Sequence, residues 1–205
     1  MIAIIDYGSG NVGAIMNLLR QRRIPHALTA KASELAAADR FILPGVGAFD
    51  PTMDTLMRSG MVDALNEEVV GKGKKVLGIC VGMHLLADGS DEGELAGLGW
   101  IPGRVRRIDD SRLSAAPKLP HMGWNDIEVQ PGAALFSDID ATRGFYFLHS
   151  YYFDAADTAH VAATVSYGAK LPCAVARDNI FGTQFHPEKS HANGMRLFAN
   201  FAGLD

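Results

Sequence analysis

The chain has 205 residues, of which 48% are hydrophobic, and its formal net charge is −4. A chain of this length can bury one substantial core, and because no Pro/Gly/Ser-rich linker divides it we expect a single domain over residues 1–205. The acidic balance gives little support to a nucleic-acid or membrane-surface role, and no apolar run approaches the roughly 18 residues that a membrane span needs.

The cysteine content and the N-terminus bear on the compartment. Cys80 and Cys173 are too few for a disulfide framework. Residues 1–6 carry neither the basic region nor the apolar stretch of a secretory signal. We therefore expect a cytoplasmic protein.

Strand and helix patterns alternate through the first half of the chain. Short apolar or β-branched runs predict strands at residues 2–5, 26–29, 40–43 and 75–80. Apolar residues three and four apart predict helices between them, at 12–19, from 33 onwards, at 52–58 and at 61–70. This order predicts an α/β fold with a parallel, doubly wound sheet, in which ligands bind at the carboxyl ends of the strands.

Two glycine-containing loops follow strands of this predicted sheet. Gly8 and Gly10 follow the first strand, but the third glycine of the dinucleotide fingerprint is absent, so a phosphate site there has little support. Residues 44–48, Pro-Gly-Val-Gly-Ala, follow the third strand, and their glycines would let backbone N–H groups turn towards a ligand. The second loop is therefore either an oxyanion donor or a plain tight turn.

Cys80 ends the fourth predicted strand, and a helical pattern begins directly after it. Gly78 and Gly82 would remove the Cβ atoms that crowd a sharp strand-to-helix turn. The free N–H groups at the start of the helix favour a thiolate over a thiol at that point. A small core cysteine at a strand end is the alternative interpretation, and the two glycines favour the nucleophile.

The second half of the chain is rich in strand patterns. Strands are expected at residues 104–108, 125–129, 144–153, 161–167, 173–177 and 180–185. Some would extend the central sheet and others would fold back as antiparallel hairpins, with Asp178 and Asn179 as the turn between the last two. A helix over residues 190–201 follows.

The last predicted strand leads into His186, Pro187 and Glu188. The histidine and the carboxylate are the base and the orienting group that a cysteine nucleophile needs. Pro187 fixes the backbone between them, so His186 could take the thiol proton while Glu188 orients the ring from its other nitrogen. A strand-end histidine by itself is more often an exposed loop residue. Together with the Cys80 turn it predicts a nucleophile, a base and an orienting group.

Several segments carry a resemblance to a known family. Residues 44–47, 78–83 and 185–188 resemble the signatures of class I, triad-type glutamine amidotransferases. Residues 120–125 and 147–152, with the Glu-Lys-Ser at 188–190, resemble the glutaminase subunits of imidazole glycerol phosphate synthases, and the likeness covers the whole chain. The resemblance implies a class I amidotransferase-like fold, with a mostly parallel sheet flanked by helices and added antiparallel strands in the C-terminal half.

The resemblance also implies an activity and a partner. The chain would hydrolyse L-glutamine to L-glutamate and ammonia through a cysteinyl thioester, without a cofactor. The ammonia would pass through a tunnel to a (β/α)₈-barrel cyclase subunit, which forms a heterodimer with the glutaminase. The cyclase makes imidazole glycerol phosphate and AICAR in histidine biosynthesis.

The same resemblance assigns roles to individual residues. Cys80 would be the nucleophile, His186 the acid and base, and Glu188 its partner. Backbone N–H groups would hold the oxyanion at Val46, Gly47 and Val81. The glutamine would be bound by Gly47, His84, Glu92, His149, Ser150 and Tyr151. The cyclase and the tunnel mouth would be faced by Asn11, Trp124, Tyr146 and Lys189.

His84 departs from the family pattern, which usually has a glutamine four residues after the cysteine, in contact with the substrate. On a helix, His84 would lie one turn behind Cys80 and change the glutamine affinity or the local charge, or have no effect. A metal site of Cys80, His84 and His186 has no further ligand spacing to support it, so no metal is expected.

Two alternatives stay open at this point. Similar amidotransferase subunits supply ammonia to other acceptors, such as surface-polysaccharide sugars, and no motif here identifies the acceptor. A non-catalytic regulatory partner is the other alternative, and the intact Cys80, His186 and Glu188 argue against it.

The glycine loop at residues 44–48 suggests control by the partner. A peptide flips at little cost beside glycine, so one oxyanion donor could rest turned away from the nucleophile. The isolated chain would then be a poor glutaminase, and a partner that prefers the competent loop would activate it.

Overall fold

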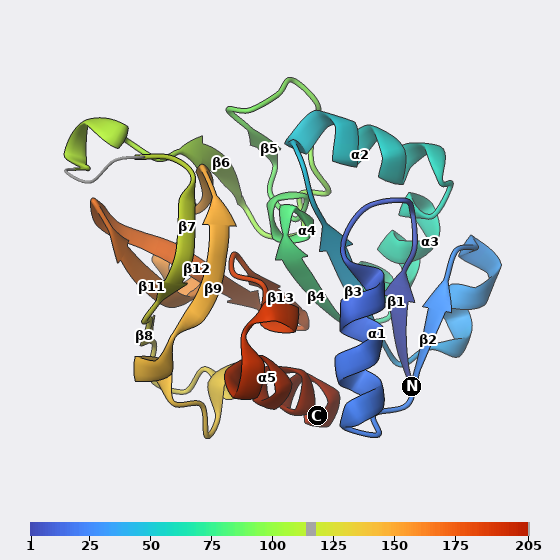
Figure 1. Cartoon of the computed structure of the whole chain (residues 1–205). Helices are drawn as coiled ribbons and strands as arrows, with labels where there is room; N and C mark the ends of the chain where they lie inside the picture. Colours follow the sequence, from blue (N-terminus) through green and yellow to red (C-terminus); the bar gives the residue numbers. More distant parts are fainter. Residues whose placement is uncertain (114–117, 205) are drawn as a thin grey trace.

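The computed structural model describes residues 1–113 and 118–204, and a mostly parallel eight-stranded sheet forms the centre of this part of the chain (Figure 1). Its strands, in spatial order, are β2 (His26–Thr29), β1 (Ile2–Ile5), β3 (Arg40–Gly45), β4 (Lys75–Cys80), β13 (Ile180–Thr183), β12 (Ala169–Arg177), β11 (Val161–Tyr167) and β8 (Glu128–Val129). The pairs from β2 to β13 are parallel, and those from β13 to β8 are antiparallel. The predicted α/β class, with antiparallel strands added in the C-terminal half, is confirmed.

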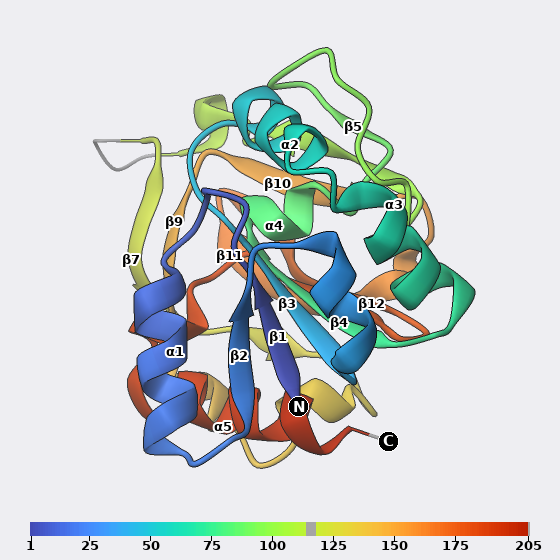
Figure 2. The same ribbon diagram turned by 90° about the vertical axis from the view of Figure 1, so that its right-hand side faces the viewer.

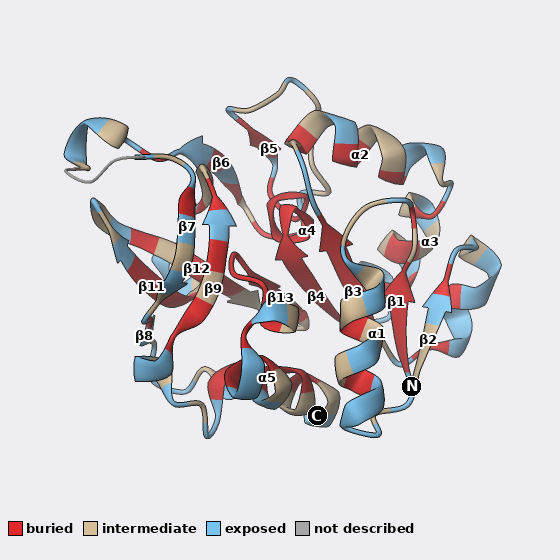
Figure 3. Ribbon diagram, in the orientation of Figure 1, coloured by how far each residue is buried: buried red, intermediate tan, exposed pale blue. Residues whose placement is uncertain are grey.

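Helices cover both faces of the sheet (Figure 2). The helices α1 (Val12–Gln21) and α5 (His191–Gly203) lie on one face, and α2 (Phe49–Arg58) and α3 (Val62–Leu65) lie on the other. Every residue of β1 is buried between these layers, as Figure 3 shows for the inner strands. Burial on both faces explains why these strands read as continuous apolar runs in the sequence. No helix in the described residues is long and apolar enough to cross a membrane.

The remaining helical segments are short. They are 3-10 turns at Ala32–Ala37, Asp110–Arg112, Ala134–Phe136, Ala141–Arg143, Thr158–His160 and Pro187–Lys189, and a π-helical turn at Asn66–Gly71. The π-helical turn continues α3, so the helix expected at 61–70 changes its hydrogen-bond pattern halfway. Glu68 in this turn is buried and its carboxylate binds the ammonium groups of Lys72 and Lys74, which holds the turn against the strand that follows.

Two small sheets stand beside the central one. One contains β10 (Tyr151–Ala155), β6 (Gly103–Arg107) and β5 (Gly89–Ser90), and the other pairs β7 (His121–Asn125) with β9 (Phe145–His149). The single strand expected at 144–153 is therefore two strands in different sheets. The chain turns at Ser150, where the His149 Nδ1 atom donates a hydrogen bond to the Tyr151 carbonyl.

The helix after Cys80 is a single turn, α4 (Val81–His84), and not the longer helix that the pattern suggested. It ends early because the N–H groups of Leu98 and Ile101 bind the carbonyls of Leu85 and Leu86. A Cβ atom on Gly82 would overlap the carbonyl oxygen of Leu43, so this glycine lets the turn press directly on β3. The chain thereby holds the residue after β4 close to the loop after β3.

Candidate active site

Three neighbouring strands end at one edge of the central sheet. The register pairs Gly45 of β3 with Cys80 of β4, and Ile79 of β4 with Thr183 of β13. The glycine loop, the cysteine and the residues after β13 therefore meet at the carboxyl ends of parallel strands, where ligands bind in open α/β sheets.

Cys80 occupies a strained turn. Its backbone has φ +56° and ψ −114°, a conformation that costs an L-residue free energy and is concentrated at functional sites. The turn lifts the sulfur clear of β4 and places it beside the first N–H groups of α4, in a pocket where only 5% of the residue is exposed. This is the geometry of a nucleophile at a strand-to-helix corner.

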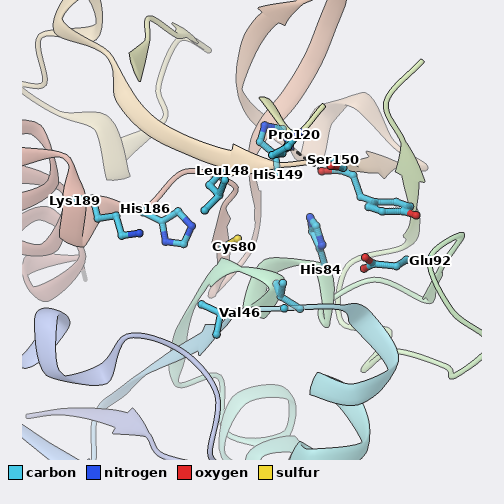
Figure 4. A pocket seen from close by; sticks show the side chains of 13 residues that line it. Val46, Cys80, His84, Glu92, Pro120, Leu148, His149, Ser150, His186 and Lys189 are labelled. Carbon is cyan, nitrogen blue, oxygen red and sulfur yellow. Dashed lines mark hydrogen bonds between the residues drawn. The ribbon is translucent and has the colours of Figure 1, made fainter. Parts of the chain in front are cut away.

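His186 and Glu188 form a buried pair beside the sulfur. The His186 Nδ1 atom lies 2.9 Å from the Glu188 Oε1 atom, and Figure 4 shows the ring next to Cys80. Burial lowers the pKa of His186, but hydrogen bonds to Cys80 and Glu188 outweigh burial and raise that pKa to about 10. At neutral pH the ring is therefore an imidazolium, and it lies between the Glu188 side chain and the Cys80 sulfur.

The backbone of His186 is fixed by contacts with β9. The His186 N–H donates to the Tyr146 carbonyl at 2.9 Å, and the Ser190 hydroxyl donates to the His186 carbonyl at 2.6 Å. The Tyr146 N–H in turn donates to the Ser190 oxygen at 3.0 Å. The position of His186 thus depends on the two-stranded β7 and β9 sheet as well as on β13.

The glycine loop after β3 is held by the β1 to α1 loop. The Val46 N–H donates to the Ser9 hydroxyl oxygen at 3.0 Å, and the Val46 carbonyl accepts from the Thr52 hydroxyl at 3.2 Å. The Tyr7 hydroxyl donates to the Pro44 carbonyl at 2.5 Å. In this conformation Ser9 occupies the Val46 N–H, one of the donors that the sequence assigned to the oxyanion.

A pocket of about 380 Å³ opens above these groups. This volume suits a small metabolite. His186 and Lys189 lie on one side of Cys80, and His84 and Glu92 lie on the other (Figure 4). The residues that the sequence singled out and that line the pocket are Val46, Gly47, Cys80, Val81, His84, Glu92, His149, Ser150, Tyr151, His186 and Lys189.

His84 acts on this site through Gln184. The His84 Nε2 atom lies 2.7 Å from the Gln184 Oε1 atom, and the Gln184 Nε2 atom lies 4.0 Å from the Cys80 sulfur. Burial lowers the pKa of His84 to about 4, so the ring is neutral at pH 7 and adds no charge. Within the described residues, no three His, Cys, Asp or Glu side chains are grouped as a metal ion would require.

Glu92 presents a carboxylate to the far side of the pocket. Its Oε2 atom accepts a hydrogen bond of 2.9 Å from the Phe49 N–H at the start of α2. Burial raises the pKa of Glu92 above its ordinary value, although a carboxylate remains the form that this N–H favours. The group is suited to bind the ammonium of an amino acid.

The residues expected at the partner surface gather beside the pocket mouth. Trp124 and Tyr146 are cross-strand neighbours on β7 and β9, and the Lys189 ammonium lies 5.4 Å from the centre of the Tyr146 ring. Trp124 stacks on His191 and stays largely exposed. Asn11 is exposed at the start of α1, which contacts the 187–189 turn.

Three residues that the sequence interpretation passed over form hydrogen bonds to residues that line the pocket: Ser9, His121 and Gln184. Gln184 carried a signal, because a polar residue in an apolar strand is expected to find a buried partner. His121 and Ser9 carried none beyond their motifs, since each acts through a residue far along the chain.

The two cysteines are expected to differ in reactivity. Cys80 should react with iodoacetamide at pH 7, because the imidazolium of His186 persists until the pH rises through about 10. Cys173 is fully buried, and burial raises its pKa well above the ordinary value, so it should stay unmodified. His186→Ala should slow the modification of Cys80 about tenfold or more and move its pH profile upward. Peptide mass spectrometry measures both sites in one sample, and equal rates would contradict an activated thiolate.

Comparison with known proteins identifies the family of the chain. The family model "Glutamine amidotransferase class-I" matches residues 3–203. The chain therefore belongs to the class-I glutamine amidotransferase family.

Two curated relatives within that family have the same name. The chain is 49% identical over 205 residues to the imidazole glycerol phosphate synthase subunit HisH of Bdellovibrio bacteriovorus, and all of both chains is covered. It is 44% identical over 204 residues to the subunit of the same name from Leptospira borgpetersenii, again over the full length of both.

A solved structure described as a glutamine amidotransferase has the same fold. It superimposes with a TM-score of 0.73 at 20% identity and covers 99% of each chain.

Proposed function

We propose that this chain is the glutaminase subunit of an imidazole glycerol phosphate synthase and acts as one cytoplasmic glutamine amidotransferase domain over residues 1–205. The observation that carries the proposal is the Cys80, His186 and Glu188 arrangement at the base of a pocket of about 380 Å³. The names of the full-length relatives support the pathway.

The proposed reaction begins with the thiolate of Cys80. Its sulfur attacks the side-chain carboxamide carbon of glutamine, and the carbonyl oxygen becomes an oxyanion near the Val81 N–H. His186 gives its Nε2 proton to the amide nitrogen, the carbon–nitrogen bond breaks, and ammonia leaves a glutamyl thioester. Glu188 keeps the ring oriented throughout.

Hydrolysis of the thioester completes the cycle. The now neutral His186 takes a proton from water, and the resulting hydroxide attacks the thioester carbon. Collapse of the second tetrahedral intermediate releases glutamate and restores the thiolate beside an imidazolium. His186 carries out each proton transfer in this scheme, and water replaces the proton that leaves with the ammonia.

The proposed glutamine pose uses both ends of the pocket. The ammonium of the amino acid would pair with the Glu92 carboxylate, which the Phe49 N–H already holds in place. The backbone from His149 to Tyr151 would bind the carboxylate of the glutamine. His84, which contacts Gln184, would line the part of the pocket that holds the glutamine side chain.

An apolar surface around the pocket mouth supports a partner subunit. Its exposed side chains are those of Val46, Met122, Trp124 and Leu148. Exposed large apolar side chains clustered beside polar groups mark protein interfaces. We assign this surface, with Asn11, Tyr146 and Lys189, to a (β/α)₈-barrel cyclase, because the ammonia formed at Cys80 has to leave through the same mouth.

The hydrogen bond from Val46 to Ser9 supports activation by that partner. An N–H that is bound to Ser9 cannot stabilise the oxyanion, so the isolated chain would hydrolyse glutamine slowly. Asn11 lies two residues from Ser9, so a partner that binds Asn11 also acts on the loop that restrains Val46.

The proposal is tested by reconstitution with a cyclase subunit. The mixture should form imidazole glycerol phosphate from the cyclase's nucleotide substrate when glutamine is the only nitrogen source. The cyclase alone should require ammonia. Glutaminase activity without any transfer to this nucleotide would assign the chain to a different acceptor, and no glutaminase activity in the complex would contradict an enzymatic role.

A further inference from the structure

A chain of side-chain hydrogen bonds, buried where His121 meets His149, runs behind the glutamine pocket. The His121 Nδ1 atom lies 2.9 Å from the His149 Nε2 atom, and the His149 Nδ1 atom lies 2.8 Å from the Tyr151 carbonyl oxygen. The Asn125 amide nitrogen lies 3.3 Å from the His121 Nε2 atom and 3.1 Å from the Ser166 carbonyl. Three side chains of β7 and β9, those of His121, Asn125 and His149, are thus connected to one turn of the pocket wall.

The contacts assign every proton in this chain. The Tyr151 carbonyl can only accept, so the His149 Nδ1 atom must be the donor. In a neutral ring the His149 Nε2 atom is then an acceptor, and His121 must donate to it from Nδ1. The His121 Nε2 atom accepts in turn from Asn125. Burial lowers the pKa of His121 to about 4 and that of His149 to about 3, so both rings are neutral at pH 7.

Aromatic packing fixes the first of these rings. His121 is stacked between Phe147, at 4.7 Å between ring centres, and Tyr167, at 4.0 Å. Both planes are inclined to that of His121 by 20°. A ring held on both faces cannot turn its Nδ1 atom away from His149 without breaking the stack.

The hydrogen bonds determine which backbone groups face the pocket. The Ser150 carbonyl accepts from the Ile108 N–H at 3.0 Å, and a trans peptide directs the Tyr151 N–H to the opposite side. The Tyr151 carbonyl lies on that same side of β10, because Tyr151 and Arg107 form a non-hydrogen-bonded pair. His149 binds this carbonyl and so prevents it from opposing an anion on this edge.

We propose that His121 is a positioning residue for glutamine binding, which acts through His149 to hold the Tyr151 carbonyl and present the Tyr151 N–H to the substrate. The inference rests on the proposed function, since it concerns the same pocket. The group that benefits is the α-carboxylate of the amino acid, because an N–H donor with a neutralised carbonyl beside it suits an anion. His121, on the inner face of the 120–125 motif, would thus act in glutamine binding.

Two substitutions separate the hydrogen bond from the stacking. His121→Phe keeps a flat ring between Phe147 and Tyr167 and removes the donor. His121→Asn keeps an N–H near the position of Nδ1 and removes the ring. If the hydrogen bond positions Tyr151, the Phe variant should bind glutamine about tenfold more weakly and the Asn variant within about twofold of the unaltered chain.

Binding is measured by the protection that glutamine gives Cys80 against iodoacetamide, which needs no turnover and no partner. The rate of modification without glutamine should be the same in all three chains, because His121 does not touch the sulfur. In the complex with cyclase, His121→Phe should raise KM with little change in kcat. A purely structural effect would instead follow the loss of packing and weaken the Asn variant more.

A second measurement needs no variant. Nitrogen-15 spectra of histidine-labelled protein at pH 7 should show both His121 and His149 as neutral rings protonated at Nδ1. A proton on Nε2 of either ring, or equal protection by glutamine in all three chains, would overturn the inference alone. Absence of protection in the unaltered chain would contradict the proposed function and the inference with it.

Discussion

Cys80→Ala is expected to abolish glutamine hydrolysis, while the complex with cyclase continues to use free ammonia. Without the sulfur no thioester forms, and removing the nucleophile of a comparable triad costs on the order of 10⁶ in kcat. The loss should be catalytic only. Alanine is smaller than cysteine and adopts the same strained turn at a similar cost, so thermal unfolding should change little.

The matched control is Cys173→Ala, which removes the other thiol of the chain. Cys173 is fully buried in β12, so this change should lower stability through a small cavity and leave the glutaminase rate of the folded protein unaltered. Steady-state assays with glutamine and with ammonia show whether each variant has lost only the glutamine-dependent activity. Glutamine-dependent synthesis by the Cys80→Ala complex would show that another group is the nucleophile.

Ser9→Ala is expected to raise the glutaminase rate of the isolated chain. The change removes the hydroxyl that binds the Val46 N–H and frees the peptide to turn towards Cys80. One oxyanion donor is worth about 10²–10³ in rate, which sets the upper limit of the gain. In the complex the variant and the unaltered chain should have similar rates, because the partner has already released the loop.

Ser9→Thr is the control, since threonine keeps a hydroxyl at the same position. It should retain the low rate of the unaltered isolated chain. The assays compare each isolated chain, the chain with cyclase, and the chain with cyclase and its nucleotide substrate. Full activity of the unaltered isolated chain would rule out partner activation, and an unchanged rate in Ser9→Ala would show that another contact restrains Val46.

Much of the fold follows from local patterns in the sequence. The strands β1, β4 and β11 have the predicted bounds, because short, mostly buried apolar runs bounded by turns favour strands over helices. The break at Ser150 was not predictable, since residues 144–153 are a continuous strand pattern. It arises from the His149 side chain and from pairing with Ile108, a residue more than forty positions away.

The candidate site could likewise be predicted only in part. Cys80, His186 and Glu188 could be grouped as candidates, and the structure brings them together, because each stands at the end of a predicted strand or beside a proline that fixes the backbone. The contacts that support these residues could not be predicted from the sequence. Ser9 reaches Val46, and His84 reaches Gln184 one hundred positions later, and neither pairing leaves a periodic trace in the sequence.

The alternation of β7 and β9 has a consequence for how such a protein can diversify. Met122, Trp124 and Leu148 project outward onto the proposed partner surface, whereas His121, Phe147 and His149 project inward. Mutations at outward positions can therefore accumulate in step with a changing cyclase while the inward positions stay under separate selection for glutamine. An ancestral subunit could exchange one ammonia acceptor for another through a handful of surface replacements and keep its chemistry intact.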